Sequence, residues 1–124
     1  MKATLIINPR SGKRKAPGII ATAERMAAEL GIQLEVKLIE GIGHGTDLAR
    51  EASQLGHERV VFAGGDGTLN AVARGLIGTT TPLGIVPMGS GNGYARSLKL
   101  PLKPEAALRI ALTGTAAPMD VCYL

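Results

Sequence analysis

A glycine-rich turn with one carboxylate interrupts the middle of the chain and could carry phosphate chemistry. Residues 60–63 are apolar and mostly suited to a strand, and they run directly into Gly64–Thr68, which reads Gly-Gly-Asp-Gly-Thr. Glycines let a ligand approach the backbone closely, and successive free amides can form an anion-binding nest. Thr68 could cap a helix or hydrogen-bond a phosphate oxygen. Asp66 would repel bare phosphate, so it suits a magnesium ion or a ribose hydroxyl; the alternative is a plain turn in which Asp66 only caps the helix.

Two further loops carry residues that could contact a nucleotide. The segment 8–13 (Asn-Pro-Arg-Ser-Gly-Lys) follows an apolar run, but it is not a Walker A loop, because the first glycine of that motif is missing and Arg14 replaces Ser or Thr. The segment 88–96 is a second glycine-rich loop, in which Ser90 and Asn92 offer hydrogen bonds. For this second loop the alternative is an ordinary irregular connection.

The net charge of +4 is concentrated in one loop, at Arg10, Lys13, Arg14 and Lys15. Such a patch could meet nucleotide phosphate, anionic lipid headgroups or nucleic acid, or it could be a solvated loop. Nucleic acid is disfavoured, because aromatic residues make up only 2% of the chain and none interleaves with the charges to stack on bases.

The elements that must position these loops alternate along the chain. The predicted strands cover residues 3–8, 33–39, 60–63, 83–87 and 119–124. The predicted helices cover residues 17–30, 46–55 with Thr46 as cap, 69–76 and 104–113, and another helix follows the second glycine-rich loop. This pattern predicts an α/β fold with an open, mostly parallel sheet and helices on both faces, so that the three loops meet at one sheet edge.

Other features limit the class of protein. The single cysteine, Cys122, excludes an internal disulfide and fits a reducing, cytoplasmic compartment. No signal peptide is visible, and no apolar run reaches the ~20 residues of a membrane helix, so we expect any membrane contact to be peripheral. His44 is expected to be a surface loop histidine. The chain stops within the last predicted strand, which indicates a segment of a longer protein and leaves an open sheet edge through which copies could pair.

Three motifs together resemble the catalytic domain of the diacylglycerol kinase and sphingosine kinase superfamily, in its bacterial lipid kinase type. They are Asn8-Pro9-x-Ser11-Gly12, the segment 64–70 (Gly-Gly-Asp-Gly-Thr-Leu-Asn) and the segment 87–96 (Pro-Met-Gly-Ser-Gly-Asn-Gly-Tyr-Ala-Arg). The resemblance covers essentially all 124 residues and implies one nucleotide-binding domain, residues 1–124. It also implies that the β-rich second domain of the family, which carries the general base and much of the lipid site, is absent from this chain.

The resemblance further implies transfer of the γ-phosphoryl group of ATP to a lipid hydroxyl, of diacylglycerol or a sphingoid-like lipid. The nucleotide-binding residues that it implies are Asn8, Pro9, Arg10, Ser11, Gly12, Gly64, Gly65, Asp66, Gly67, Thr68, Leu69, Asn70, Gly89, Ser90 and Asn92. Asp66 and Asp120 match acidic positions of the magnesium network. A threonine that contacts the nucleotide in bacterial relatives falls at about Ile39 here, so the resemblance implies that this contact is lost.

No residue of the chain is a convincing general base, since that role needs a carboxylate or histidine aimed at the acceptor. We therefore expect a nucleotide-binding domain of a lipid kinase that docks on a membrane surface. Two alternatives remain open: an NAD-kinase-like enzyme with a soluble dinucleotide as acceptor, and a non-catalytic module that binds nucleotide.

Overall fold

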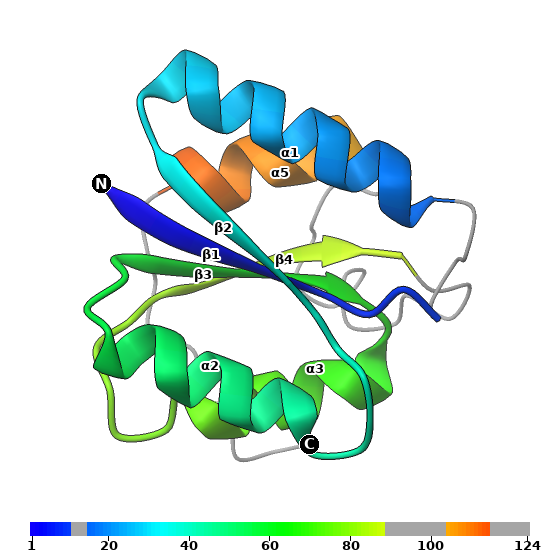
Figure 1. Ribbon diagram of the computed structural model, residues 1–124, viewed down its shortest axis with the longest axis vertical. Helices are drawn as coiled ribbons and strands as arrows, with labels where there is room; N and C mark the ends of the chain where they lie inside the picture. Colours follow the sequence, from blue (N-terminus) through cyan, green and yellow to red (C-terminus); the bar gives the residue numbers. More distant parts are fainter. Residues whose placement is uncertain (11–14, 89–103, 115–124) are drawn as a thin grey trace.

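The computed structural model describes residues 1–10, 15–88 and 104–114, and in this part of the chain four parallel strands form one open sheet (Figure 1). The strands are β1 (Lys2–Ile7), β2 (Gln33–Leu38), β3 (Arg59–Gly64) and β4 (Leu83–Pro87). The helices of the described ranges are α1 (Ala16–Leu30), α2 (His44–Gln54), α3 (Asp66–Gly75) and α5 (Pro104–Thr113). The strand order is β2-β1-β3-β4. The predicted α/β fold is confirmed.

The predicted element bounds agree with the structure to within a few residues. The strand at 83–87 and the helix at 104–113 have the predicted bounds. One prediction is wrong: Thr46 does not cap α2, because that helix begins at His44 after Gly43, whose φ of 80° reverses the chain. The hydroxyl of Thr46 instead donates to the Ala71 carbonyl oxygen of α3, 2.6 Å away. The predicted strand at 119–124 and the helix after residue 96 lie outside the described residues.

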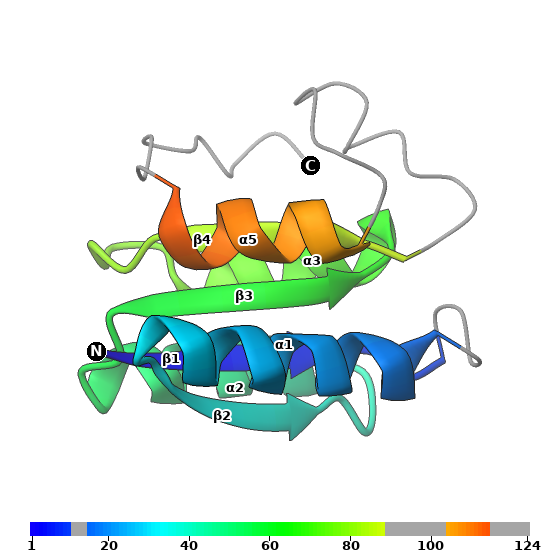
Figure 2. The ribbon, with the colours of Figure 1, turned by 90° about the horizontal axis from the view of Figure 1, so that it is seen from above.

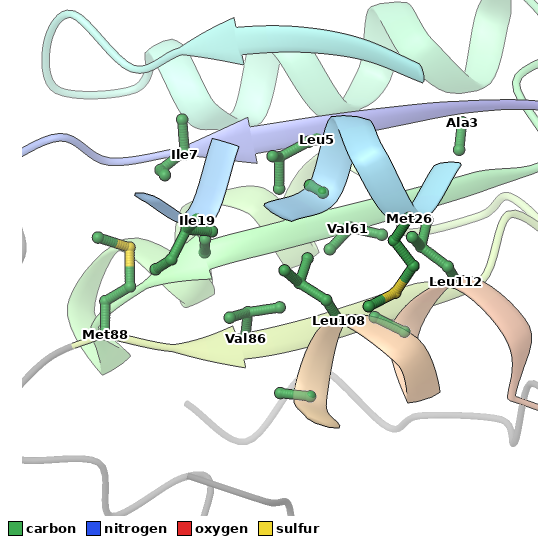
Figure 3. Close-up of a cluster of buried hydrophobic side chains, with 14 of the residues drawn as sticks. Ala3, Leu5, Ile7, Ile19, Met26, Val61, Val86, Met88, Leu108 and Leu112 are labelled. Atoms are coloured by element: carbon green, nitrogen blue, oxygen red, sulfur yellow. The ribbon is translucent and has the colours of Figure 1, made fainter. Parts of the chain in front are cut away.

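Two aliphatic clusters hold the layers together, one on each face of the sheet. On one face, α1 and α5 cover Leu5, Val61 and Val86, and Figure 3 shows Met26 and Leu108 meeting above these strands. On the other face, α2 and α3 cover Ile6, Phe62 and Ile85, and Val72 is one of the residues that α3 contributes to this second cluster. Because β1 and β3 are buried on both faces, their sequences are mostly continuous apolar runs rather than alternating ones; Thr4 in β1 is a buried polar exception, and its hydroxyl is hydrogen-bonded to His57 Nδ1.

The connections place a crevice between β1 and β3. The chain leaves β1 through α1 on one face and returns to β2; it then leaves β2 through α2 on the opposite face and crosses to β3. The segments that follow β1 and β3 therefore diverge to opposite faces of the sheet. In open parallel sheets this point, outside the carboxyl ends of the strands, is where ligands bind.

Close packing accounts for part of the glycine excess. A Cβ atom on Gly75 would lie 2.3 Å from the Thr46 carbonyl oxygen and 2.8 Å from the Ala49 Cβ atom, so this glycine lets α3 approach α2. A Cβ atom on Gly84 would lie 2.5 Å from the Cβ atom of Ala111, where α5 crosses β4. The expectation that the glycines serve ligand-binding loops is therefore incomplete.

None of the helices in the described ranges is long and apolar enough to cross a membrane.

We expect Gly75→Ala to lower the free energy of unfolding by about 1–3 kcal/mol, because the added methyl group must push α2 and α3 apart. Urea denaturation followed by circular dichroism measures this change. Gly18→Ala is the matched control, since a Cβ atom there meets nothing within 4 Å on α1; it should leave the stability unchanged or raise it by up to about 1 kcal/mol. Equal stability of Gly75→Ala and the unsubstituted chain would contradict the packing argument.

Candidate functional site

A hollow of about 250 Å³ opens at the carboxyl ends of β1, β2 and β3. One wall comes from the residues after β1 and from the first turns of α3, and the other wall comes from the loop between β2 and α2. The lining residues are Asn8, Arg10, Ile39, Gly41, Ile42, Gly43, Gly45, Gly67, Thr68 and Ala71. Asn8, Arg10, Gly67 and Thr68 are thus four of the predicted nucleotide-binding residues that the structure brings together around one space.

A directional chain of hydrogen bonds fixes the first wall. The backbone N–H of Asn8 donates to the Ala63 carbonyl oxygen (2.9 Å), which extends the pairing of β1 with β3 by one residue. The Asn8 side-chain amide donates from Nδ2 to Thr68 Oγ1 (2.9 Å), and its Oδ1 accepts from the Arg10 amide (3.1 Å). Since Thr68 Oγ1 accepts this bond, its own proton remains able to donate to another group.

The amino end of α3 lies beside this chain. Gly65 is the N-cap residue, in an extended conformation with φ −98° and ψ 177°, and no side chain caps the helix. The Leu69 amide donates to the Gly65 carbonyl oxygen (3.1 Å), and helix geometry leaves the preceding amides of residues 66–68 without an intrahelical acceptor. The prediction that Thr68 might cap the helix is therefore wrong, because Thr68 is the third helical residue. The helix dipole makes this end favourable for an anion.

The glycines of the turn have different roles. A Cβ atom on Gly67 would meet nothing within 4 Å, so its backbone is open toward the hollow. A Cβ atom on Gly64 would lie 2.5 Å from the ring of buried Phe62, so packing alone requires glycine at the end of β3. The side chain of Leu69 is 1% exposed and belongs to the core under α3, whereas Asn70 and Pro9 are half-buried.

The second wall was not predicted as a wall of the site, although the resemblance places a nucleotide-contact position of bacterial relatives at about Ile39. Ile39 extends the pairing with β1 through its amide, which donates to the Ile7 carbonyl oxygen (2.9 Å), and its side chain is 7% exposed. Ile42 is fully exposed on the rim. His44, expected to be a surface loop histidine, is the partly buried first residue of α2, and its Nδ1 accepts from the Glu40 amide (2.9 Å). The sequence contained one indication of this wall: the loop between β2 and α2 follows the carboxyl end of a predicted parallel strand, where ligands bind in such sheets.

Several predicted site residues lie outside the described residues: Ser11, Gly12, Lys13, Arg14, Gly89, Ser90, Asn92 and Asp120. For Asp66 the structure describes the backbone, at the start of α3, but not the side chain. Within the described ranges, no group of three or more His, Cys, Asp or Glu side chains could hold a metal ion. The magnesium assignments to Asp66 and Asp120 remain predictions. Of the predicted basic patch, Arg10 and Lys15 are described, and both are exposed.

Comparison with known proteins gives a consistent result. The family model for the diacylglycerol kinase catalytic domain matches residues 2–124. A probable lipid kinase YegS-like of Chromohalobacter salexigens is 40% identical over 121 residues, which cover 94% of this chain and 38% of that protein. Sphingosine kinase B of Dictyostelium discoideum is 32% identical over 130 residues, which cover 99% of this chain and 17% of that protein.

The solved structure of a putative diacylglycerol kinase from Bacillus anthracis has the same fold. It matches with a TM-score of 0.76 and 27% sequence identity, over 90% of this chain and 41% of that chain. The chain thus spans about 40% or less of the length of these relatives. Since the family model matches nearly every residue, the chain belongs to the diacylglycerol kinase catalytic domain family.

Proposed function

We propose that the hollow binds ATP and that this chain is the ATP-binding domain of a lipid kinase. The observation that carries the proposal is the chain of hydrogen bonds from the Arg10 amide through Asn8 to Thr68 Oγ1. It holds the loop after β1 against the first turn of α3 and leaves the Thr68 hydroxyl proton able to donate, beside helix amides that have no intrahelical acceptor. This is an arrangement suited to phosphate oxygens.

The two walls would divide the nucleotide between them. The phosphates would lie at the amino end of α3, near the Gly67 backbone, the Thr68 hydroxyl and the exposed Arg10 side chain. The apolar wall with Ile39 and Ile42 suits the flat faces of a base. Ligand pockets typically have volumes of about 300–1,000 Å³, so a hollow of about 250 Å³ supports the idea that residues beyond the described ones complete the site.

Phosphoryl transfer depends on positioning and charge neutralisation more than on covalent help from the protein. The chain supplies positioning through backbone amides and hydroxyl donors on a rigid sheet edge. Asp66 and Asp120 are the proposed holders of the magnesium ion that would neutralise phosphate charge. Ser11, Gly12, Gly89, Ser90 and Asn92 are proposed to add further nucleotide contacts from the flanking loops.

The acceptor chemistry is assigned to other parts of a longer protein. Residues 1–124 are proposed as the nucleotide-binding domain, and a second, β-rich domain is proposed to carry the general base and to bind diacylglycerol or a sphingoid-like lipid. The support is the length comparison, since the lipid kinase relatives extend well beyond the matched region. We further propose that the whole protein is cytoplasmic and docks peripherally on the membrane.

Calorimetric titration of the chain with ATP should show saturable binding that is stronger with magnesium. Thr68→Ala should weaken this binding about tenfold or more, because it removes a hydrogen bond to a charged phosphate. Asp66→Ala should abolish the magnesium dependence. Thr79→Ala is the control, since its hydroxyl donates to Leu76 beyond the other end of α3 and binding should not change. Equal losses in the Thr68 and Thr79 variants would count against the assignment.

Gly67→Ala should separate binding from stability. The new methyl group meets no protein atom within 4 Å but enters the hollow, so we expect ATP affinity to fall about tenfold while the free energy of unfolding stays level or rises by up to about 1 kcal/mol. Calorimetry and urea denaturation measure the two quantities on one preparation. Unchanged affinity in this variant would show that no ligand group approaches the Gly67 backbone.

A full-length protein that contains this chain should phosphorylate a lipid hydroxyl when assayed with radiolabelled ATP and a panel of diacylglycerol and sphingoid lipids in mixed micelles. Substitution of Thr68 by alanine in that protein should lower the rate with every lipid of the panel, because the substitution acts on the shared nucleotide. Product formed only from NAD would favour the dinucleotide kinase alternative. Nucleotide binding without any phosphorylated product would favour a non-catalytic module.

A further inference from the structure

The outer edge of β2 offers unpaired backbone groups. β2 is the last strand in the order β2-β1-β3-β4, and within the described ranges no strand pairs with its other side. Figure 2 shows β2 as the outermost element of the sheet at its end of the molecule, beyond α1 and α2. An exposed strand edge is a template for pairing with another strand.

The hydrogen bonds to β1 determine which residues face outward. The Gln33 amide donates to the Met1 carbonyl oxygen, and the Ile39 amide donates to the Ile7 carbonyl oxygen. Because backbone groups alternate along a strand, residues 33, 35, 37 and 39 direct their backbone groups toward β1. The amides and carbonyls of Leu34, Val36 and Leu38 therefore point away from β1, and none of the described strands pairs with them.

The side chains of β2 divide between the two faces. Leu34 and Val36 are only partly buried against the core under α1, and Leu38 is 46% exposed. On the opposite face Lys37 Nζ lies 2.7 Å from Glu35 Oε1, with both side chains well exposed. The hydrogen bond from Lys37 lowers the pKa of Glu35, and Glu35 in turn raises the pKa of Lys37, so both groups are charged at neutral pH. Buried His57 lies behind them, with its Nε2 atom 3.8 Å from Glu35 Oε2.

The charges select one register for a pair of β2 strands from two copies. Around a two-fold axis at Val36, antiparallel pairing sets Leu34 opposite Leu38 of the other copy, and all outward backbone groups can bond. The same register sets Glu35 of each copy opposite Lys37 of the other copy, so that one such contact lies on each side of the two-fold axis. Registers centred on Glu35 or on Lys37 instead set each of these residues opposite its own copy, which brings like charges together.

We propose that two copies of this chain associate through antiparallel pairing of β2 with β2 in the register centred on Val36. The partly exposed leucine and valine side chains then form a continuous apolar strip across the two copies, and the two ion pairs of the opposite face become intermolecular. The pairing is isologous and uses the β2 edge completely, so this contact joins two copies and no more. This dimer proposal does not depend on the proposal that the hollow binds ATP. It is tested by measuring whether the particle in solution has the mass of one copy or of two.

Charge reversal at the edge tests the proposal on the 124-residue chain. Glu35→Lys alone sets lysines opposite each other, and Lys37→Glu alone sets glutamates opposite each other. Each variant should raise the dimer dissociation constant about tenfold or more. Mixing the two variants in equal amounts places opposite charges at both contacts again, and a heterodimer should form with an affinity near that of the unsubstituted chain. Sedimentation velocity over a micromolar to millimolar series measures the three affinities.

Two controls separate the edge from other causes. Glu24→Lys makes the same charge change on the exposed face of α1 and should leave the dimer intact. Val36→Pro removes an outward amide that makes no bond to β1, so the fold should persist while the dimer is lost; circular dichroism checks the fold. A chain that is monomeric throughout the series, a dimer unaffected by Val36→Pro, or a mixture that fails to form the heterodimer would each overturn the proposal.

Discussion

The pairing of β1 with β3 is the constraint on which the rest of the structure depends. Both strands are buried on both faces, so their inner side chains must be apolar or, like Thr4, hydrogen-bonded within the protein, and charged side chains appear only where the strands begin or end. Val60 to Ala63 and four of the five residues from Ala3 to Ile7 are aliphatic or, at Phe62, aromatic; the fifth, Thr4, is hydrogen-bonded to His57. Residues that could contact a ligand are thereby confined to the segments after the carboxyl ends of β1 and β3. Because these two segments leave toward opposite faces of the sheet, the space between them stays open.

The Asn8 side chain converts this topology into a defined geometry. Without a bond between them, the loop after β1 and the start of α3 could shift relative to each other, because they belong to different elements. The amide of Asn8 bonds to both, through Arg10 on one side and Thr68 on the other. Asn8 and Thr68 are 60 residues apart in the sequence, so this hydrogen bond joins two distant segments of the chain into one wall.

The fold could be predicted from the sequence largely because the apolar runs and helical periodicities are uninterrupted. The motif around Gly67 and Thr68 could be located because a glycine-rich turn between a buried strand and a helix is a typical phosphate-binding element, although the packing role of Gly64 could not be read from it. The wall that includes Ile39 and Ile42 could not be located from the sequence pattern, because isoleucines that follow a strand are indistinguishable from core residues until the order of the strands in the sheet is known. The roles of Gly75 and Thr46 could not be predicted either. They depend on how closely and at what angle α2 and α3 cross, and the sequence of a single helix does not show this.

The contact between α2 and α3 has a mechanical consequence for the hollow. With Gly75 against the Thr46 backbone and the Thr46 hydroxyl bonded to Ala71, the two helices are interlocked along their lengths. The loop that begins α2 and the first turn of α3 are thus carried by one rigid body, although they line different sides of the same space. Gly45 at the start of α2 and Gly67 at the start of α3 both line the hollow, so the packing of these two helices sets its width between them.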